Sequence, residues 1–157
     1  MIVQGELFVE DKVSNLSTYY HGDCLVEMNN IADKSVDAII CDLPYGITAN
    51  KWDIVIPFEP LWKEYERLIK PNGAIVLTSS QPFTSALVMS NPKLFKYELI
   101  WDKVNKYTCY QISNHRPLCR HENILIFSKG KVTFNKQYRE GKPYKAKRTN
   151  GFGKNIL

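Results

Sequence analysis

The sequence predicts an α/β fold in which a mostly parallel sheet carries helices on both faces. Short apolar runs of strand length alternate with amphipathic segments of helical spacing along most of the chain. The clearest strand, residues 36–41, is almost continuously apolar, as expected of a strand buried between two layers of helices. Helical segments separate the early strands, so we expect parallel neighbours joined by right-handed crossovers.

The first half of the chain begins with a short strand candidate at 18–21 and a helix over 24–32, where Leu25, Met28 and Ile31 have helical spacing. The strand 36–41 and a loop over 42–56 follow. A second, amphipathic helix is predicted over 58–69 and should end before Pro71 and Gly73.

The second half contains a buried strand at 74–78, a helix over 82–89 that begins with proline, and strands at 97–102 and 122–128. From residue 129 the sequence is basic and has no sustained periodicity. We therefore predict a folded unit over 1–128 and a basic loop region over 129–157.

Charge divides the chain unevenly. Residues 1–92 hold 6 Lys and Arg against 12 Asp and Glu, whereas residues 93–157 hold 15 against 4, which gives net charges of −6 and +11. A basic half that also carries several tyrosines suits binding to a polyanion, although a solvated basic face without a partner explains the charge equally well.

No segment is long and apolar enough to span a bilayer, and the four cysteines lack paired short spacing. We therefore expect a cytoplasmic protein with reduced thiols.

Three chemically distinct groups follow the strand 36–41. Asp42 supplies a carboxylate, Pro44 stiffens the backbone and Tyr45 offers a flat aromatic face. Open α/β folds place ligands at the carboxyl ends of their strands. This combination suits a planar base that bears an exocyclic amine.

Asp42-Leu43-Pro44-Tyr45 resembles the Asp-Pro-Pro-Tyr signature of DNA amino-methyltransferases, with leucine in place of the first proline. Other segments resemble landmarks of that family in the same order. They are His21-Gly22-Asp23-Cys24, Asn50-Lys51-Trp52-Asp53, residues 67–77, Ser80-Gln81-Pro82-Phe83, Ile100-Trp101-Asp102-Lys103 and residues 121–127.

The resemblance implies a Rossmann-like methyltransferase that uses S-adenosylmethionine to methylate the exocyclic amine of adenine, or less favourably cytosine, in double-stranded DNA whose target base is flipped out of the helix. Asp42, Leu43, Pro44 and Tyr45 would be catalytic, and Asp23, Cys24 and Asp42 would bind the cofactor. The DNA contacts expected are Lys51, Trp52, Lys103, Arg116 and Arg120. The basic region 129–157 would contact DNA or begin a target recognition region.

One expected feature is missing. The family holds its cofactor with a glycine-rich turn after a strand, and no Gly-x-Gly turn of that kind follows a strand here. The sheet is therefore expected to be incomplete, as in the first half of the branch that places its catalytic half first. The chain could be the catalytic portion of an enzyme, a catalytically silent DNA-binding remnant, or one half of a split enzyme, and a homodimer is also open. His115, Cys119 and His121 have irregular spacing, so no metal site is predicted.

Overall fold

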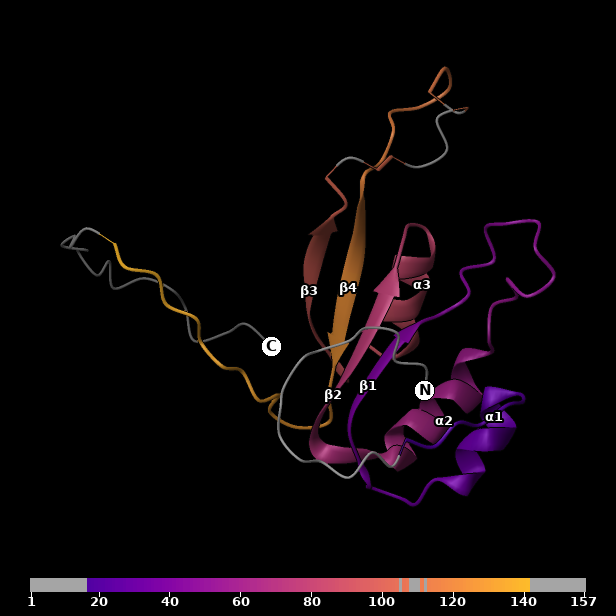
Figure 1. Cartoon of the computed structure of the whole chain (residues 1–157), viewed down its shortest axis with the longest axis vertical. Helices are drawn as coiled ribbons and strands as arrows, with labels where there is room; N and C mark the ends of the chain where they lie inside the picture. The colour runs from indigo at the N-terminus through magenta and orange to yellow at the C-terminus, as the bar shows by residue number, and fades with distance from the viewer. Residues whose placement is uncertain (1–16, 105, 108–110, 112, 142–157) are drawn as a thin grey trace.

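Four strands form one sheet in the order β1-β2-β4-β3 (Figure 1). The computed structural model describes residues 17–104, 106–107, 111 and 113–141. The elements in chain order are α1 (Cys24–Glu27), a 3-10 turn η1 (Met28–Asn30), β1 (Val36–Asp42), α2 (Phe58–Leu68), β2 (Ile69–Ser79), α3 (Phe83–Ser90), β3 (Phe95–Asp102) and β4 (His121–Phe127).

The α/β class is as predicted, but the expected strand directions are wrong for most of the described sheet. β1 and β2 are parallel, whereas β4 is antiparallel to both β2 and β3. A helix joins β1 to β2 and returns the chain to the same end of the sheet. No α-helix is described between β3 and β4, and β4 runs back in the opposite direction and inserts between β2 and β3.

The prediction of helices on both faces is also wrong for the described residues. The strand residues that pack into the core with α2 and α3 all project from one face of the sheet: Ile39, Ile75, Leu77, Leu125 and Phe127. Ile40 and Leu99 project from the opposite face and are exposed. The described helices therefore cover a single face.

Helix α2 follows its sequence pattern closely. Leu61, Trp62, Tyr65 and Leu68 recur at helical spacing and are all buried, with Glu59 in the first turn and Arg67 in the last, as the helix dipole favours. The indole nitrogen of Trp62 donates to the hydroxyl of Ser90 at 2.7 Å, which links α2 to the end of α3.

Arg67 ties α2 to the segment before β1. Its guanidinium donates to the carbonyls of Met28 and Ile31 at 2.7 and 2.9 Å, and it forms ion pairs with Asp33 and Glu64. These bonds satisfy carbonyls at the end of η1 and fix the chain before it enters β1.

Several predicted boundaries change. The helix predicted over 24–32 is shorter, because α1 ends at Glu27 and η1 ends at Asn30. Residues 18–21 form no strand, because no described strand lies beside them to pair with. Strand β2 starts at Ile69 instead of residue 74, since Ile69 pairs with Val36 and the extra residues before Ala74 are taken up by a register shift.

Residues 129–141 contain no helix or strand (Figure 1). Within the described part of the chain, every helix is too short or too polar to traverse a bilayer.

Candidate active site

Asp42 is the last residue of β1 and lies exposed at the carboxyl end of the two parallel strands. Its register partner on β2 is Thr78. The Tyr45 hydroxyl donates to Asp42 Oδ1 at 2.8 Å, and the Thr78 hydroxyl donates to the same oxygen. The parallel pairing of β1 with β2 therefore brings a carboxylate, a phenol and a hydroxyl together.

Tyr45 is half-buried, and its ring lies against Phe83 at the start of α3 with 5.2 Å between centroids and 26° between planes. Burial, together with the nearby Asp42 carboxylate, raises the pKa of the Tyr45 hydroxyl above its ordinary value. The phenol therefore stays neutral at physiological pH and acts as a hydrogen-bond donor to Asp42.

The two residues between Asp42 and Tyr45 anchor this turn. The side chain of Leu43 is buried in the core, and Pro44 is partly buried beside it. A buried anchor and a ring-restrained φ angle hold the backbone between the carboxylate and the aromatic ring. Leucine at position 43 thus supports the turn by packing.

The loop after Tyr45 is organised by Asp53. The backbone N–H groups of Gly46, Ile47 and Thr48 donate to the Asp53 carboxylate at 2.8, 3.0 and 2.7 Å. Gly46 has φ of 69°, a left-handed conformation that favours glycine and lets the chain turn toward Asp53. Hydrogen bonds from the Thr48 side chain and the Gly46 N–H lower the pKa of Asp53 to about 2.

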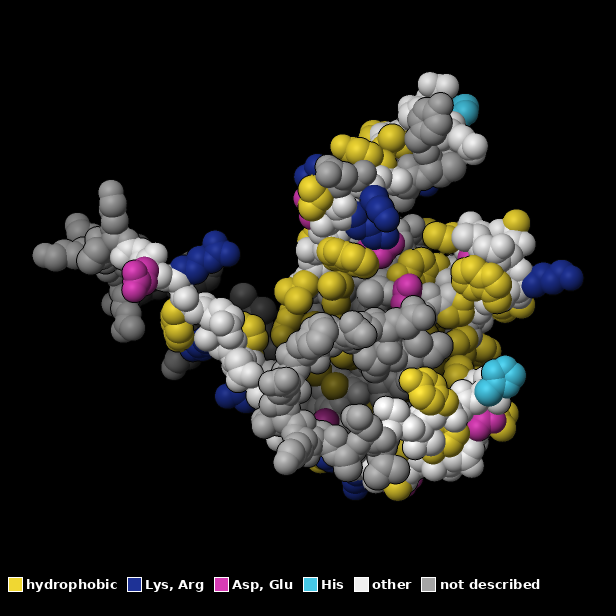
Figure 2. Space-filling view, in the orientation of Figure 1, with side chains coloured by type: hydrophobic (Ala, Val, Ile, Leu, Met, Phe, Trp, Pro, Cys, Tyr) yellow, Lys and Arg dark blue, Asp and Glu magenta, His cyan; other side chains and the backbone are white. Residues whose placement is uncertain are grey.

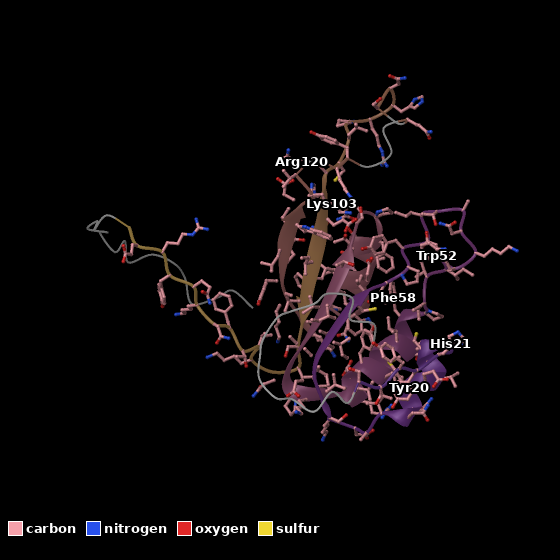
Figure 3. The ribbon with its side chains drawn as sticks, in the orientation of Figure 1. Tyr20, His21, Trp52, Phe58, Lys103 and Arg120 are labelled. Atoms are coloured by element: carbon pink, nitrogen blue, oxygen red, sulfur yellow. The ribbon has the colours of Figure 1, made fainter. Side chains whose placement is uncertain are left out.

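Lys51 and Trp52 lie at the tip of this ordered loop, where Trp52 is 72% exposed. Figure 3 labels Trp52 on the segment between β1 and α2. An exposed indole and an ammonium, carried on a loop beside the candidate site, are accessible to a large partner.

The other predicted DNA contacts differ in their surroundings. Lys103 forms an ion pair with Glu122, and Arg120 forms one with Asp102 at 2.8 Å, so both cations are engaged within the described structure (Figure 3). Arg116 is exposed and lines a cavity of about 220 Å³ next to the end of β2, together with Ser80, Gln81, Pro117, Cys119, His121 and Asn123.

Asp23 and Cys24 begin α1. The Asp23 side chain accepts the Leu25 N–H at 2.8 Å, which makes it the N-cap of this short helix. Burial, followed by the nearby Asp23 carboxylate, raises the pKa of the Cys24 thiol. Figure 3 places the neighbouring Tyr20 and His21 beside α1, well apart from Lys103 and Arg120. The described residues contain no cluster of three potential metal ligands.

A family model described as DNA methylase, for the N6 and N4 methyltransferases, matches residues 36–156. The match covers most of the chain and includes Asp42-Leu43-Pro44-Tyr45. The chain belongs to this DNA methylase family. Its resemblance to the amino-methyltransferases is thereby confirmed.

Solved structures agree with the family assignment. M1.HpyAVI, crystallised as a complex with SAM, is similar at 26% identity and a TM-score of 0.57 over 78% of this chain and 62% of that chain. The cytosine-N4-specific PvuII DNA methyltransferase has 14% identity and a TM-score of 0.55 over 72% of this chain and 49% of that one. A putative DNA modification methylase of Thermus thermophilus, TTHA0409, has 20% identity and a TM-score of 0.51 over 77% of this chain and 54% of that one. The methylase chain thus spans less than two thirds of the length of these proteins.

The described residues of this DNA methylase do not form a complete site for S-adenosylmethionine. The Asp23 side chain caps α1 through one carboxylate oxygen, and no glycine-rich turn follows a described strand. The outer edge of β1, where Asp42 ends the strand, pairs with no described strand.

Two residues of the site were missed by sequence reasoning. Thr78 was expected only as the last residue of a strand. Its place in the site could have been predicted from the register of the two parallel strands, because Asp42 and Thr78 end them side by side. Asp53 stood within a recognised segment but had no assigned role. The sequence feature that indicates this role is the distance from the turn at Gly46. An acid five to seven residues after such a turn can accept hydrogen bonds from several of its backbone N–H groups.

Proposed function

We propose that this chain is the catalytic portion of a DNA methyltransferase that uses S-adenosylmethionine to methylate the N6 amine of adenine. One observation carries the proposal. Asp42 stands at the carboxyl end of two parallel strands, and Tyr45 and Thr78 fix its carboxylate through Oδ1. The family assignment and the 26% identity to M1.HpyAVI, whose structure contains SAM, support the reaction type and the cofactor.

The target base must leave the duplex to reach Asp42, at an unstacking cost of roughly a few kcal/mol. We propose that the Tyr45 ring, already fixed against Phe83, provides a stacking surface for the flipped base. Phe83 holds the ring at a defined orientation, which reduces the entropy lost when the base arrives.

The amine of the base would then donate its hydrogens to Asp42 and to the Leu43 carbonyl. These acceptors would orient the amine lone pair toward the methyl donor. Positive charge would develop on the amine nitrogen as it bonds to the methyl carbon and the carbon–sulfur bond of the donor breaks. The Asp42 carboxylate would stabilise that charge until the nitrogen loses a proton. Tyr45 and Thr78 keep the carboxylate in place by binding Oδ1.

DNA would approach from the side that carries the 46–53 loop. Lys51 and Trp52 are exposed on that loop, and Arg116 is exposed at the cavity next to the end of β2. All three would contact the phosphate backbone near the flipped base. Lys103 and Arg120 would have to exchange their carboxylate partners for phosphates. We further propose that the basic region 129–157 adds phosphate contacts that carry no sequence information.

The cofactor half requires strands that the described sheet lacks. We propose that they pair along the outer edge of β1 and supply the glycine-rich turn, either within one longer polypeptide or from a separate chain. We place the protein in the cytoplasm, where thiols such as those of Cys24 and Cys41 stay reduced.

The test is methyl transfer to duplex DNA from labelled S-adenosylmethionine, with the methylated nucleoside identified by mass spectrometry. The 157-residue chain is assayed alone and with the part of M1.HpyAVI that lies outside the matched region. We expect N6-methyladenine. Asp42→Ala should lower the rate by at least about 100-fold, as for removal of a key electrostatic group.

Asp37→Ala is the matched control, because Asp37 is an exposed acid on the same strand at its opposite end. Its rate should stay within about twofold of the unmodified chain, since surface changes away from a site have small effects. Transfer that survives Asp42→Ala would remove Asp42 from the mechanism. N4-methylcytosine would replace the adenine assignment, and no transfer in either arrangement would contradict the proposed function.

A further inference from the structure

The loop between β1 and α2 exposes several apolar side chains. Ile47, Trp52 and Ile54 are 60%, 72% and 70% exposed. Tryptophan is highly buried on average, so an indole with this much exposure is informative. Figure 2 shows hydrophobic side chains gathered on this part of the surface, next to a lysine or arginine side chain. Lys51, the neighbour of Trp52, is exposed as well, so the loop presents a large apolar ring beside a positive charge.

Trp52 stands on a fixed backbone, although the loop contains no helix or strand. The next residue, Asp53, is 8% exposed and accepts three consecutive backbone N–H groups, from Gly46 to Thr48. The Asp53 N–H donates in turn to the Asn50 carbonyl at 3.0 Å, which closes a tight turn around Trp52. A group that is already held in place loses less entropy when it binds a partner.

The same hydrogen bonds place Trp52 near Tyr45. Gly46 directly follows Tyr45, and its N–H donates at 2.8 Å to Asp53, which directly follows Trp52. The backbone positions of the two aromatic residues are therefore close together at the base of the loop. Since Tyr45 is the proposed stacking surface for the flipped base, Trp52 is placed to contact the duplex next to the position that this base leaves.

We propose that the Trp52 indole inserts into the base stack and fills the space that the flipped adenine leaves. Other proteins that open or kink DNA insert apolar side chains between bases in this way. The indole is a fused two-ring system of about the size of a purine, so it can stack on both neighbouring base pairs. A phosphate contact alone would use the indole N–H and leave the apolar ring in water. The inference rests on the proposed function, because it assumes that a base is flipped.

The charges of the loop favour DNA over a protein partner. Residues 46–56 contain two charged side chains, Lys51 and Asp53. The Asp53 carboxylate is occupied by backbone N–H groups, whereas the Lys51 ammonium is carried on the exposed turn beside the indole. Phosphates flank every gap in a base stack, so a cation next to the inserted ring complements them.

Binding to a duplex that contains one abasic site tests the proposal. Such a duplex already has the gap, but it has no base for Tyr45 to hold. Fluorescence anisotropy with the full 157-residue chain compares this duplex, with the abasic site opposite thymine, with the intact duplex of the same sequence. We expect the abasic duplex to bind at least about fivefold more tightly, because a base–aromatic stack of ordinary strength changes the affinity by that factor or more. Trp52→Ala should abolish the preference, and Trp52→Phe should keep part of it.

Trp101→Ala and Tyr45→Ala are the controls. Trp101 is also an exposed tryptophan but lies on β3, and Tyr45 has no base to contact in the abasic duplex, so both variants should keep the preference. Lys51→Ala should weaken binding to the two duplexes by a similar factor, since both contain the phosphate that it contacts. Circular dichroism should show that all variants remain folded.

Three outcomes would overturn the proposal. They are an unmodified chain that shows no preference for the abasic duplex, a preference that survives Trp52→Ala, and a preference that Trp101→Ala removes equally well. The binding assay involves no methyl transfer, so these outcomes concern the inserted indole, while the methylation assay decides the proposed reaction.

Discussion

At the scale of single residues, the site depends on one carboxylate oxygen that two hydroxyls share. Tyr45 and Thr78 both donate to Oδ1 of Asp42. Tyr45 combines two functions, because its hydroxyl fixes the acid while its ring lies on Phe83. Variants that remove the hydroxyl or the whole ring separate these functions.

We predict that Tyr45→Phe binds DNA nearly as well as the unmodified chain, whereas Tyr45→Ala binds more weakly. The phenylalanine ring can still stack on a flipped base. Loss of a base–aromatic stack costs about 1–3 kcal/mol, which corresponds to roughly 5–150-fold in affinity. Fluorescence anisotropy with a duplex that contains one mismatched adenine measures the difference, since such a base is easiest to flip. Equal affinities of the two variants would show that the ring does not contact the base.

At the scale of elements, the loop between β1 and α2 is held by an acid rather than by secondary structure. Asp53 accepts three consecutive backbone N–H groups, from Gly46 to Thr48. This arrangement fixes the path of the chain directly after Tyr45. It also presents Lys51 and Trp52 to solvent at a defined place.

We predict that Asp53→Ala destabilises the protein at neutral pH and that the effect disappears in acid. The folded pKa of about 2 lies below the ordinary carboxyl value of 3.8. Stabilisation by Asp53 is therefore fully present above about pH 4 and is lost as the pH falls through about 2. Urea unfolding of both proteins at a series of pH values measures the free-energy difference. A difference that persists unchanged down to about pH 2 would contradict this assignment.

At the scale of the whole molecule, the described helices and the core lie on one side of the sheet. Leu77, Leu125 and Phe127 are fully buried against α2 and α3, while Ile40 on the opposite face is 60% exposed. Both sheet edges also lack a described partner strand. One face of the sheet therefore contributes most of the described core, and the two edges are suited to interactions with further strands.

We predict that Leu125→Ala lowers the free energy of unfolding by about 2–5 kcal/mol, the range for a buried leucine whose removal leaves a cavity. Ile40→Ala should cost less than about 1 kcal/mol, because exposed substitutions have small effects. Chemical denaturation of both variants provides the comparison. A larger loss for Ile40→Ala would mean that the face that carries it is covered in solution.

The sequence by itself determined the α/β class, the position of nearly every helix and strand, and the family. Local periodicity and the acid–proline–aromatic turn after residue 41 were sufficient for these, because they depend on neighbouring residues. Only the tertiary structure decided the strand directions, the single helical layer, and the meeting of Asp42 with Thr78. These features depend on pairing between segments far apart in the chain, and the spacing of residues along it does not specify which strands become neighbours.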